Sequence, residues 1–117
     1  MNLFKKLIML ASLKNKKKIE LLFRLGKKKG SGFFECRYLS CSEDDGSLLF
    51  AVVAPKKNLP RAVDRNKIKR RIRVALHKEK DLLADSGFNR FLFIYLKEEV
   101  FSFGIVQKEL AKLIRSL

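Results

Sequence analysis

The sequence contains little cysteine, proline, glycine or acid, and each shortage excludes a class of protein. Two cysteines among 117 residues are too few for a disulfide scaffold, and their C-x4-C spacing without a second pair is not typical of a zinc site. Two prolines and six glycines exclude collagen-like and low-complexity chains. No apolar run approaches the roughly 18 residues that a membrane-spanning helix needs. There is also no Gly-rich phosphate loop and no nucleophile beside a base, so the sequence predicts no catalytic side chain and no metal ligands.

What the sequence has in excess is positive charge. Lys and Arg number 27 against 12 Asp and Glu, which gives a formal net charge of +15. Ten Phe residues and a hydrophobic content of 47% exclude a disordered basic tail, because these side chains need a core. Residues 1–30 carry a net charge of +9 and residues 61–80 carry +7, so two segments supply the whole positive field. This division indicates that the protein binds polyanions. The two segments would contact either two faces of one long anion or two distinct anionic partners.

Hydrophobic periodicity predicts six elements in the order helix, strand, strand, helix, strand, helix. The first helix is expected over residues 15–25, with Gly26 as its C-cap. Two strands are expected over residues 33–39 and 48–54, separated by a polar turn at residues 42–47. Because these strands are neighbours in sequence, we expect them to pair as a hairpin.

The second helix carries the densest charge. Its apolar positions Ile68, Ile72, Ala75 and Leu76 fall on one side of a helical wheel, and Asp64 is the expected N-cap. Like charges this close repel one another on an isolated helix. We therefore expect the apolar stripe to pack on a sheet while a ligand neutralises the basic side.

The remaining elements complete the expected architecture. The run at residues 91–96 is apolar at every position, as in a strand covered on both faces, and a last helix is expected from about Ser102. The strand–helix–strand unit over residues 48–96 is of the kind that gives parallel pairing. The predicted fold is a two-layer α/β (α+β) sandwich, with a small mixed sheet carrying helices on one or both faces.

Residues 65–73 combine six basic groups with a polar amide on the amphipathic second helix. Arg suits bidentate contacts with phosphate, and Lys suits looser point-charge contacts. The amide of Asn66 donates and accepts, so it can hold a base edge, a sugar hydroxyl or a neighbouring Arg. The alternative is an ordinary solvated basic face.

The stretch at residues 54–73 resembles the bacterial ribonuclease P protein subunit. That family shows a strand ending in Ser-Lys-Lys, a short loop, an Ala-Val pair and an Arg-Asn-Arg helix, and this sequence has Pro-Lys-Lys, Ala-Val and Arg-Asn-Lys in that order. Residues 13–26 resemble the first helix of the family. The sequence departs from the pattern at Ala54-Pro55, where Val-Ser is usual, at Lys67, where the second Arg is usual, and at Ile19, where Phe is usual.

The resemblance implies a protein component of ribonuclease P, in which a partner RNA removes the 5′ leader of precursor tRNA with bound magnesium that is held mainly by the RNA. It implies a left-handed strand–helix–strand crossover. Because Cys36 and Cys41 suit a reducing compartment, we expect a cytoplasmic protein, with neither a membrane nor an obligate protein partner. The residues implied to bind the catalytic RNA are Arg65, Asn66, Lys67, Lys69, Arg70 and Arg73. Those implied to line a cleft for the single-stranded leader are Phe23, Lys56, Lys57 and Arg61.

Several alternatives stay open at this level. Phe23 serves equally well as a stacking platform for bases or as core filler. A ribosomal-type protein that only scaffolds RNA explains the charge and size as well. A membrane-surface protein that uses residues 1–12 is a third reading. In the preferred interpretation, residues 1–12 form a mobile or loosely docked extension and residues 13–117 form a single RNA-binding domain.

Overall fold

The computed structural model describes residues 10–41 and 47–117, which form one five-stranded mixed sheet and four helices. The strands lie in the order β1-β4-β5-β3-β2. They are β1 (Leu10–Ser12), β2 (Lys27–Gly30), β3 (Phe34–Leu39), β4 (Leu48–Val53) and β5 (Arg90–Tyr95). The helices are α2 (Lys16–Leu25), α3 (Ala62–Lys78), α4 (Lys80–Asp85) and α5 (Phe103–Arg115).

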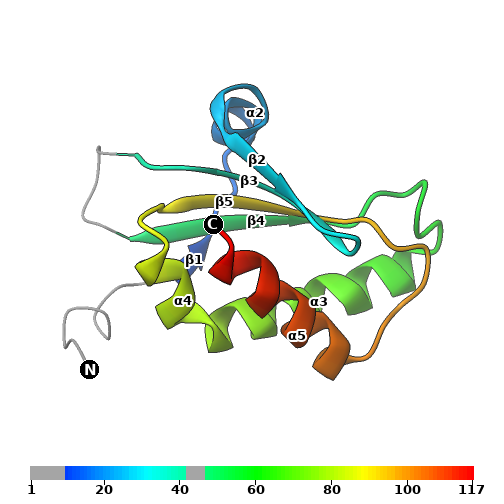
Figure 1. Ribbon diagram of the computed structural model, residues 1–117. Coiled ribbons are helices and arrows are strands. Elements are labelled where there is room, and N and C mark those ends of the chain that lie inside the picture. The colour runs from blue at the N-terminus through cyan, green and yellow to red at the C-terminus, as the bar shows by residue number, and fades with distance from the viewer. Residues whose placement is uncertain (1–9, 42–46) are drawn as a thin grey trace.

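The helices divide unequally between the two faces of the sheet. Helices α3, α4 and α5 form a layer on one face, and α2 lies alone on the other (Figure 1). Strand β3 contributes side chains to both faces. Phe34, Cys36 and Tyr38 are buried in the core beneath α3 and α5, and the residues between them face the α2 side. On that side a smaller cluster forms around Leu22 and Leu92. The α+β class and the mixed sheet are confirmed.

Strand β5 lies at the centre of the sheet. It pairs in parallel with β4, as predicted, and antiparallel with β3. The predicted hairpin between the strands at residues 33–39 and 48–54 is therefore wrong, since β5 lies between them. The apolar sequence of β5 explains this order. Its side chains are apolar on both faces of the sheet, and a strand is covered by helices on both faces only near the centre of the sheet. The hand of the β4-to-β5 crossover stays a prediction.

Three elements are additional to those expected, namely β1, β2 and α4. Strand β1 pairs in parallel with β4, so the ordered domain includes Leu10–Ser12, which the predicted boundary assigned to the extension. Strand β2 forms a true hairpin with β3, although all four of its residues are exposed and three are lysines. Residues 1–9 lie outside the described residues, as do residues 42–46 of the turn predicted at residues 42–47.

Helix α2 is capped at its N-terminus by Asn15 and at its C-terminus by Gly26. The side chain of Asn15 accepts hydrogen bonds from the N–H groups of Lys17 (2.9 Å) and Lys18 (3.3 Å). Gly26 is the C-cap, as predicted, but its φ of −69° is open to other residues. Glycine is needed there because a Cβ atom would lie 2.5 Å from the carbonyl oxygen of Leu22.

Helix α3 begins at Ala62, earlier than predicted, and its N-cap is Arg61 rather than Asp64. Asp64 instead lies in the first turn, with a carboxylate oxygen 4.0 Å from Nε of Arg61, where it also complements the helix dipole. The predicted apolar stripe is confirmed, since Ile68 and Ile72 are fully buried with their neighbours on the same side. In the described part of the chain, no helix is both long and apolar enough to cross a membrane.

Candidate nucleic-acid interface

Because the apolar stripe of α3 is buried, the opposite side of the helix faces away from the sheet. Five of the six residues expected to bind RNA line one shallow depression on this outer surface, together with the exposed side chain of Val63. These five residues, here named the α3 basic face, are Asn66, Lys67, Lys69, Arg70 and Arg73. The rigid helix thus gives the cations fixed spacing.

The positive charge of the α3 basic face is not neutralised by the described residues. Within residues 10–41 and 47–117, the ion pairs of Glu35, Asp64 and Glu109 are made with cations outside this face and leave its four cations without such a partner. A cluster of like charges without internal counterions raises the local potential and attracts an external anion. The α3 basic face therefore fits a phosphate backbone.

Arg65, the sixth residue expected to bind RNA, makes hydrogen bonds within the protein. Its Nη1 atom donates hydrogen bonds to the carbonyl oxygens of Leu59 (2.9 Å) and Pro60 (2.7 Å). Leu59 is itself almost fully buried. Arg65 therefore fastens the loop between β4 and α3 to the helix, and its expected contact with RNA stays a prediction.

A second group of residues gathers on the α2 side of the sheet. The side chain of Phe23 is 43% exposed, which rejects the core-filler alternative. Arg37 of β3 lies against it, with Cζ 5.7 Å from the ring centroid and Nη1 donating to the carbonyl oxygen of Phe23 at 2.9 Å. An exposed ring beside a cation suits a single-stranded nucleic acid, because bases stack while the cation attracts phosphate.

Glu35 holds Arg37 in this position. Its carboxylate accepts from Nε of Arg37 at 3.0 Å and lies 3.4 Å from Nζ of Lys28 on the neighbouring strand. Burial pushes the pKa of Glu35 upward, but the hydrogen bonds from Arg37 and Lys28 and the positive charges of both groups together outweigh it, so the pKa lies below the usual value. We name Phe23, Arg37, Glu35 and Lys28 the Phe23 flank.

Sequence reasoning missed Arg37, Glu35 and Lys28. A signal was present for the first two, since they alternate with the buried residues of β3 and must face the opposite side of the sheet. No such signal existed for Lys28, because nothing in a run of three lysines indicates a strand.

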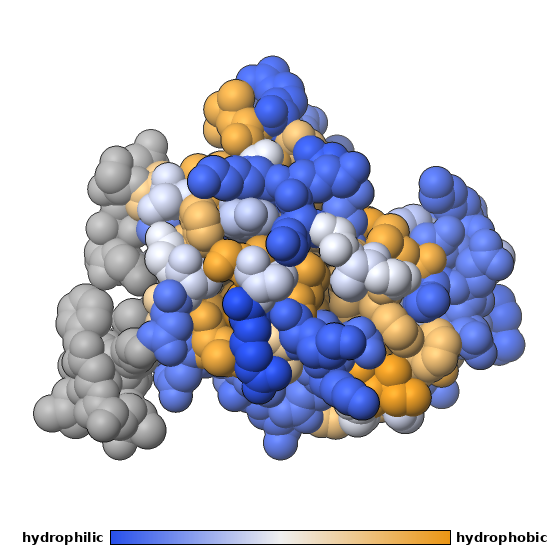
Figure 2. Space-filling model, viewed as in Figure 1, coloured by the Kyte–Doolittle hydropathy of each residue, from blue (hydrophilic) through white to orange (hydrophobic). Residues whose placement is uncertain are grey.

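The other residues expected to bind the leader lie on the loop between β4 and α3. Lys56, Lys57 and Arg61 are exposed there. Asn58 fixes this loop to the end of β5 by donating from Nδ2 to the carbonyl oxygen of Tyr95 at 3.3 Å. Figure 2 shows hydrophilic residues gathered at this end of the molecule and also along α2. The cation–π contact of Phe23 and the side-chain hydrogen bond to its carbonyl oxygen are both made with Arg37, so a cleft shared by Phe23 with Lys56, Lys57 and Arg61 stays a prediction.

A basic helix held on a sheet, with an exposed aromatic ring among cations on the opposite face, defines an RNA-binding protein of the α+β class. A family model described as Ribonuclease P matches residues 9–117, and the chain belongs to this family. No curated protein sequence matches the chain.

Solved structures show the same fold. The chain is similar to the RNase P protein of Staphylococcus aureus, with a TM-score of 0.77, 20% identity and coverage of 90% of this chain and 93% of that one. It is also similar to the RNase P protein of Thermotoga maritima, with a TM-score of 0.75, 21% identity and coverage of 91% and 96%. The family resemblance expected from residues 54–73 is thus confirmed.

Membership makes the chain a protein component of ribonuclease P, the ribonucleoprotein endoribonuclease of tRNA processing, and a partner of the RNase P RNA. In this family the RNA carries the chemistry. Within residues 10–41 and 47–117, no three His, Cys, Asp or Glu side chains come together to hold a metal ion. Because the chain belongs to the ribonuclease P family, the ribosomal-type alternative is not favoured.

Proposed function

We propose that the α3 basic face binds the phosphate backbone of the RNase P RNA and that the Phe23 flank binds the 5′ leader of precursor tRNA. The observation that carries the proposal is the cluster of cations on α3 that the described acids leave unneutralised. Because α2 and α3 lie on opposite faces of the sheet, one protein can contact two RNA strands at once (Figure 1).

The contribution of the protein would be binding and positioning. Cations between two RNAs offset the repulsion between their phosphates, which favours docking of the substrate. Phe23 would stack a leader base, while Arg37 and the loop residues Lys56, Lys57 and Arg61 attract its phosphates. Magnesium would be held mainly by the RNA, whose phosphate oxygens are ligands that this ion prefers.

We also propose that the protein acts in the cytoplasm. Both cysteines, Cys36 and Cys41, are free thiols, which suits a reducing compartment.

The test is reconstituted cleavage of precursor tRNA with the partner RNA at low magnesium, with and without the protein. We expect the protein to raise the cleavage rate and to increase affinity for a substrate with a leader more than for mature tRNA. Unchanged rate and affinity on adding protein would reject the proposal.

The two surfaces are tested separately. Replacing Lys69, Arg70 and Arg73 together by Gln should weaken binding of the partner RNA. The matched control removes the same number of charges from α5, at Lys108, Lys112 and Arg115, and should weaken it less. Equal losses in both variants would show that only total charge matters and would reject a role specific to the α3 basic face.

A further inference from the structure

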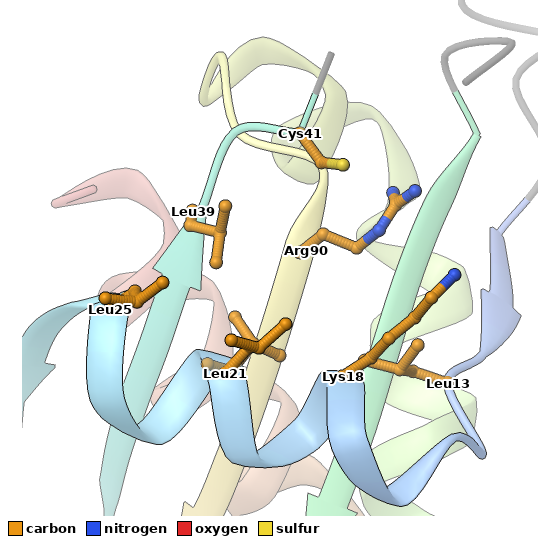
Figure 3. A pocket seen from close by; sticks show the side chains of 8 residues that line it. Leu13, Lys18, Leu21, Leu25, Leu39, Cys41 and Arg90 are labelled. Carbon is orange, nitrogen blue, oxygen red and sulfur yellow. The ribbon is translucent and has the colours of Figure 1, made fainter. Parts of the chain in front are cut away.

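The side of α2 opposite Phe23 carries an apolar pocket of about 180 Å³ between the helix and the sheet. Five of its eight lining residues are leucines. Figure 3 shows Leu25 and Leu39 at one end and Lys18 and Leu13 at the other. Cys41 lies at its margin, held in place because its backbone N–H and carbonyl oxygen bond the Asn89 side chain at 2.8 and 2.7 Å. We name this cavity the leucine pocket.

Helix geometry separates the leucine pocket from the Phe23 flank. At about 100° per residue, Lys18, Leu21 and Leu25 project from one side of α2 and Phe23 from the other, with Leu22 buried between them. Leu25 is 70% exposed and Leu21 40% exposed. Figure 2 shows such an apolar patch on the otherwise hydrophilic α2. Exposed leucines beside a cavity are typical of a site that a ligand covers.

The volume limits the ligand to a small one. An apolar cavity of roughly 150 Å³ lined by similar side chains accepts benzene, whereas drug-sized ligands occupy about 300 Å³ or more. The leucine pocket therefore accommodates an alkyl or aryl group of about six to eight carbons.

The charges at the pocket favour an anionic ligand. Among the described residues that line it, Lys18 and Arg90 are basic and none is acidic. The guanidinium of Arg90 is buried and donates to the carbonyl oxygens of Ser47 (3.0 Å) and Asn89 (2.9 Å), so Lys18 is the basic lining group that a ligand from solvent can reach. Lys18 is exposed and lies in the first turn of α2, where the helix dipole adds to its charge.

We propose that the leucine pocket binds a small hydrophobic carboxylate, with its hydrocarbon group among the leucines and its carboxylate at the ammonium group of Lys18. This site is separate from both RNA-binding surfaces, so it goes beyond the function proposed above. The two proposals can fail independently, because each has its own residues and its own ligand.

The test is an NMR titration of the full-length, 15N-labelled protein with hexanoate, using hexanamide as the neutral isostere and acetate as the anion without a hydrocarbon chain. We expect hexanoate to shift the amide signals of Leu21, Leu25, Leu39 and Cys41, and acetate to leave them unchanged. Because an exposed ion pair is worth little, hexanoate should bind roughly threefold more tightly than hexanamide.

Two variants distinguish the effect of the Lys18 charge from the effect of the overall positive charge of the protein. Lys18→Gln should abolish the preference for hexanoate over hexanamide. Lys17→Gln removes the neighbouring charge, which does not line the pocket, and should retain the preference. Equal affinity of the wild-type protein for the acid and the amide would overturn the proposal, as would the absence of shifts at the pocket or shifts centred on Phe23.

Alkylation supplies a second readout. Cys36 is fully buried, and burial together with the charge of Glu35 raises its pKa to about 12, so iodoacetamide should modify Cys41 alone. Hexanoate should slow the modification of Cys41, with the product followed by mass spectrometry. An unchanged rate at a saturating concentration of hexanoate would contradict occupancy of the pocket.

Discussion

Arg37 binds Phe23 twice, through a 2.9 Å hydrogen bond to its carbonyl oxygen and through a guanidinium that lies 5.7 Å from the centroid of its ring. The carbonyl belongs to the last turn of α2 and Arg37 belongs to β3, so this contact ties the helix to the sheet. Glu35 holds the other edge of the guanidinium. An exposed aromatic side chain is thereby fixed before any ligand arrives, which lowers the entropic cost of binding.

Replacing Phe23 by Ala tests this ring as a stacking platform. We expect the affinity for a single-stranded leader oligonucleotide to fall by about 1–3 kcal/mol, because one base loses its stacking partner. Stability should change little since the ring is 43% exposed. Fluorescence anisotropy and urea unfolding give the two quantities. Leu25→Ala, on the opposite side of α2, is the control and should leave the affinity unchanged; a comparable loss there would contradict a specific role for Phe23.

Arg65 and Arg70 should differ in what they contribute. Arg65→Ala removes two hydrogen bonds from a charged donor and should lower the free energy of unfolding by about 1–3 kcal/mol. Arg70→Ala should leave stability nearly unchanged but lower the salt slope of RNA binding by roughly 0.7 to 0.9. Urea titrations and binding isotherms across a salt series measure these effects. A stable Arg65 variant, or an unchanged slope for the Arg70 variant, would contradict the assignment.

The ion pairs of Glu35 predict a dependence of stability on pH. Because its pKa is lower in the folded protein than its reference value of 4.5, ionised Glu35 stabilises the fold above that pH. This stabilisation, about 0.2–1 kcal/mol for a partly exposed group, is lost as the pH falls through the folded-state pKa. The difference in unfolding free energy between wild type and Glu35→Gln should therefore be constant near neutral pH and vanish in acid. A difference independent of pH would show that charge plays no part.

Gly26→Ala should destabilise the protein through a steric clash. A Cβ atom at this position lies 2.5 Å from the carbonyl oxygen of Leu22, so the end of α2 must move. We expect a loss of about 1–3 kcal/mol, measured by thermal or urea unfolding. Gly32→Ala is the matched control, because nothing lies within 4 Å of its added Cβ. If both variants unfold alike, the close approach at Gly26 has no energetic consequence.

The sequence predicted most reliably the elements whose hydrophobic pattern drives their own burial. The apolar run of β5 and the stripe that includes Ile68 and Ile72 both lie where periodicity placed them. Strand order could not be read in the same way, because pairing depends on which strand can fill the centre of the sheet. Strand β2 was missed for a related reason: it is held by backbone pairing with β3, and backbone pairing leaves no mark in a run of lysines.

The candidate site was predictable as a segment but not as individual roles. The charge of residues 65–73 identified α3, and helical geometry then brought five of the six expected residues together. The inward role of Arg65 depends on the path of the preceding loop, which local sequence does not specify. To predict the role of Arg37, one must know which strand lies under α2. The packing of the whole domain determines this.

The position of β5 also governs how the domain is assembled. It is the last strand in the chain but the central one in the sheet, so β3 and β4 have no common neighbour until residues 90–95 have left the ribosome. A nascent chain that ends before β5 holds two separate strand groups and an unburied basic helix. We therefore expect cooperative folding to begin late in synthesis, and with it the ability to capture RNA, so that truncated products would compete poorly with finished protein for the partner transcript.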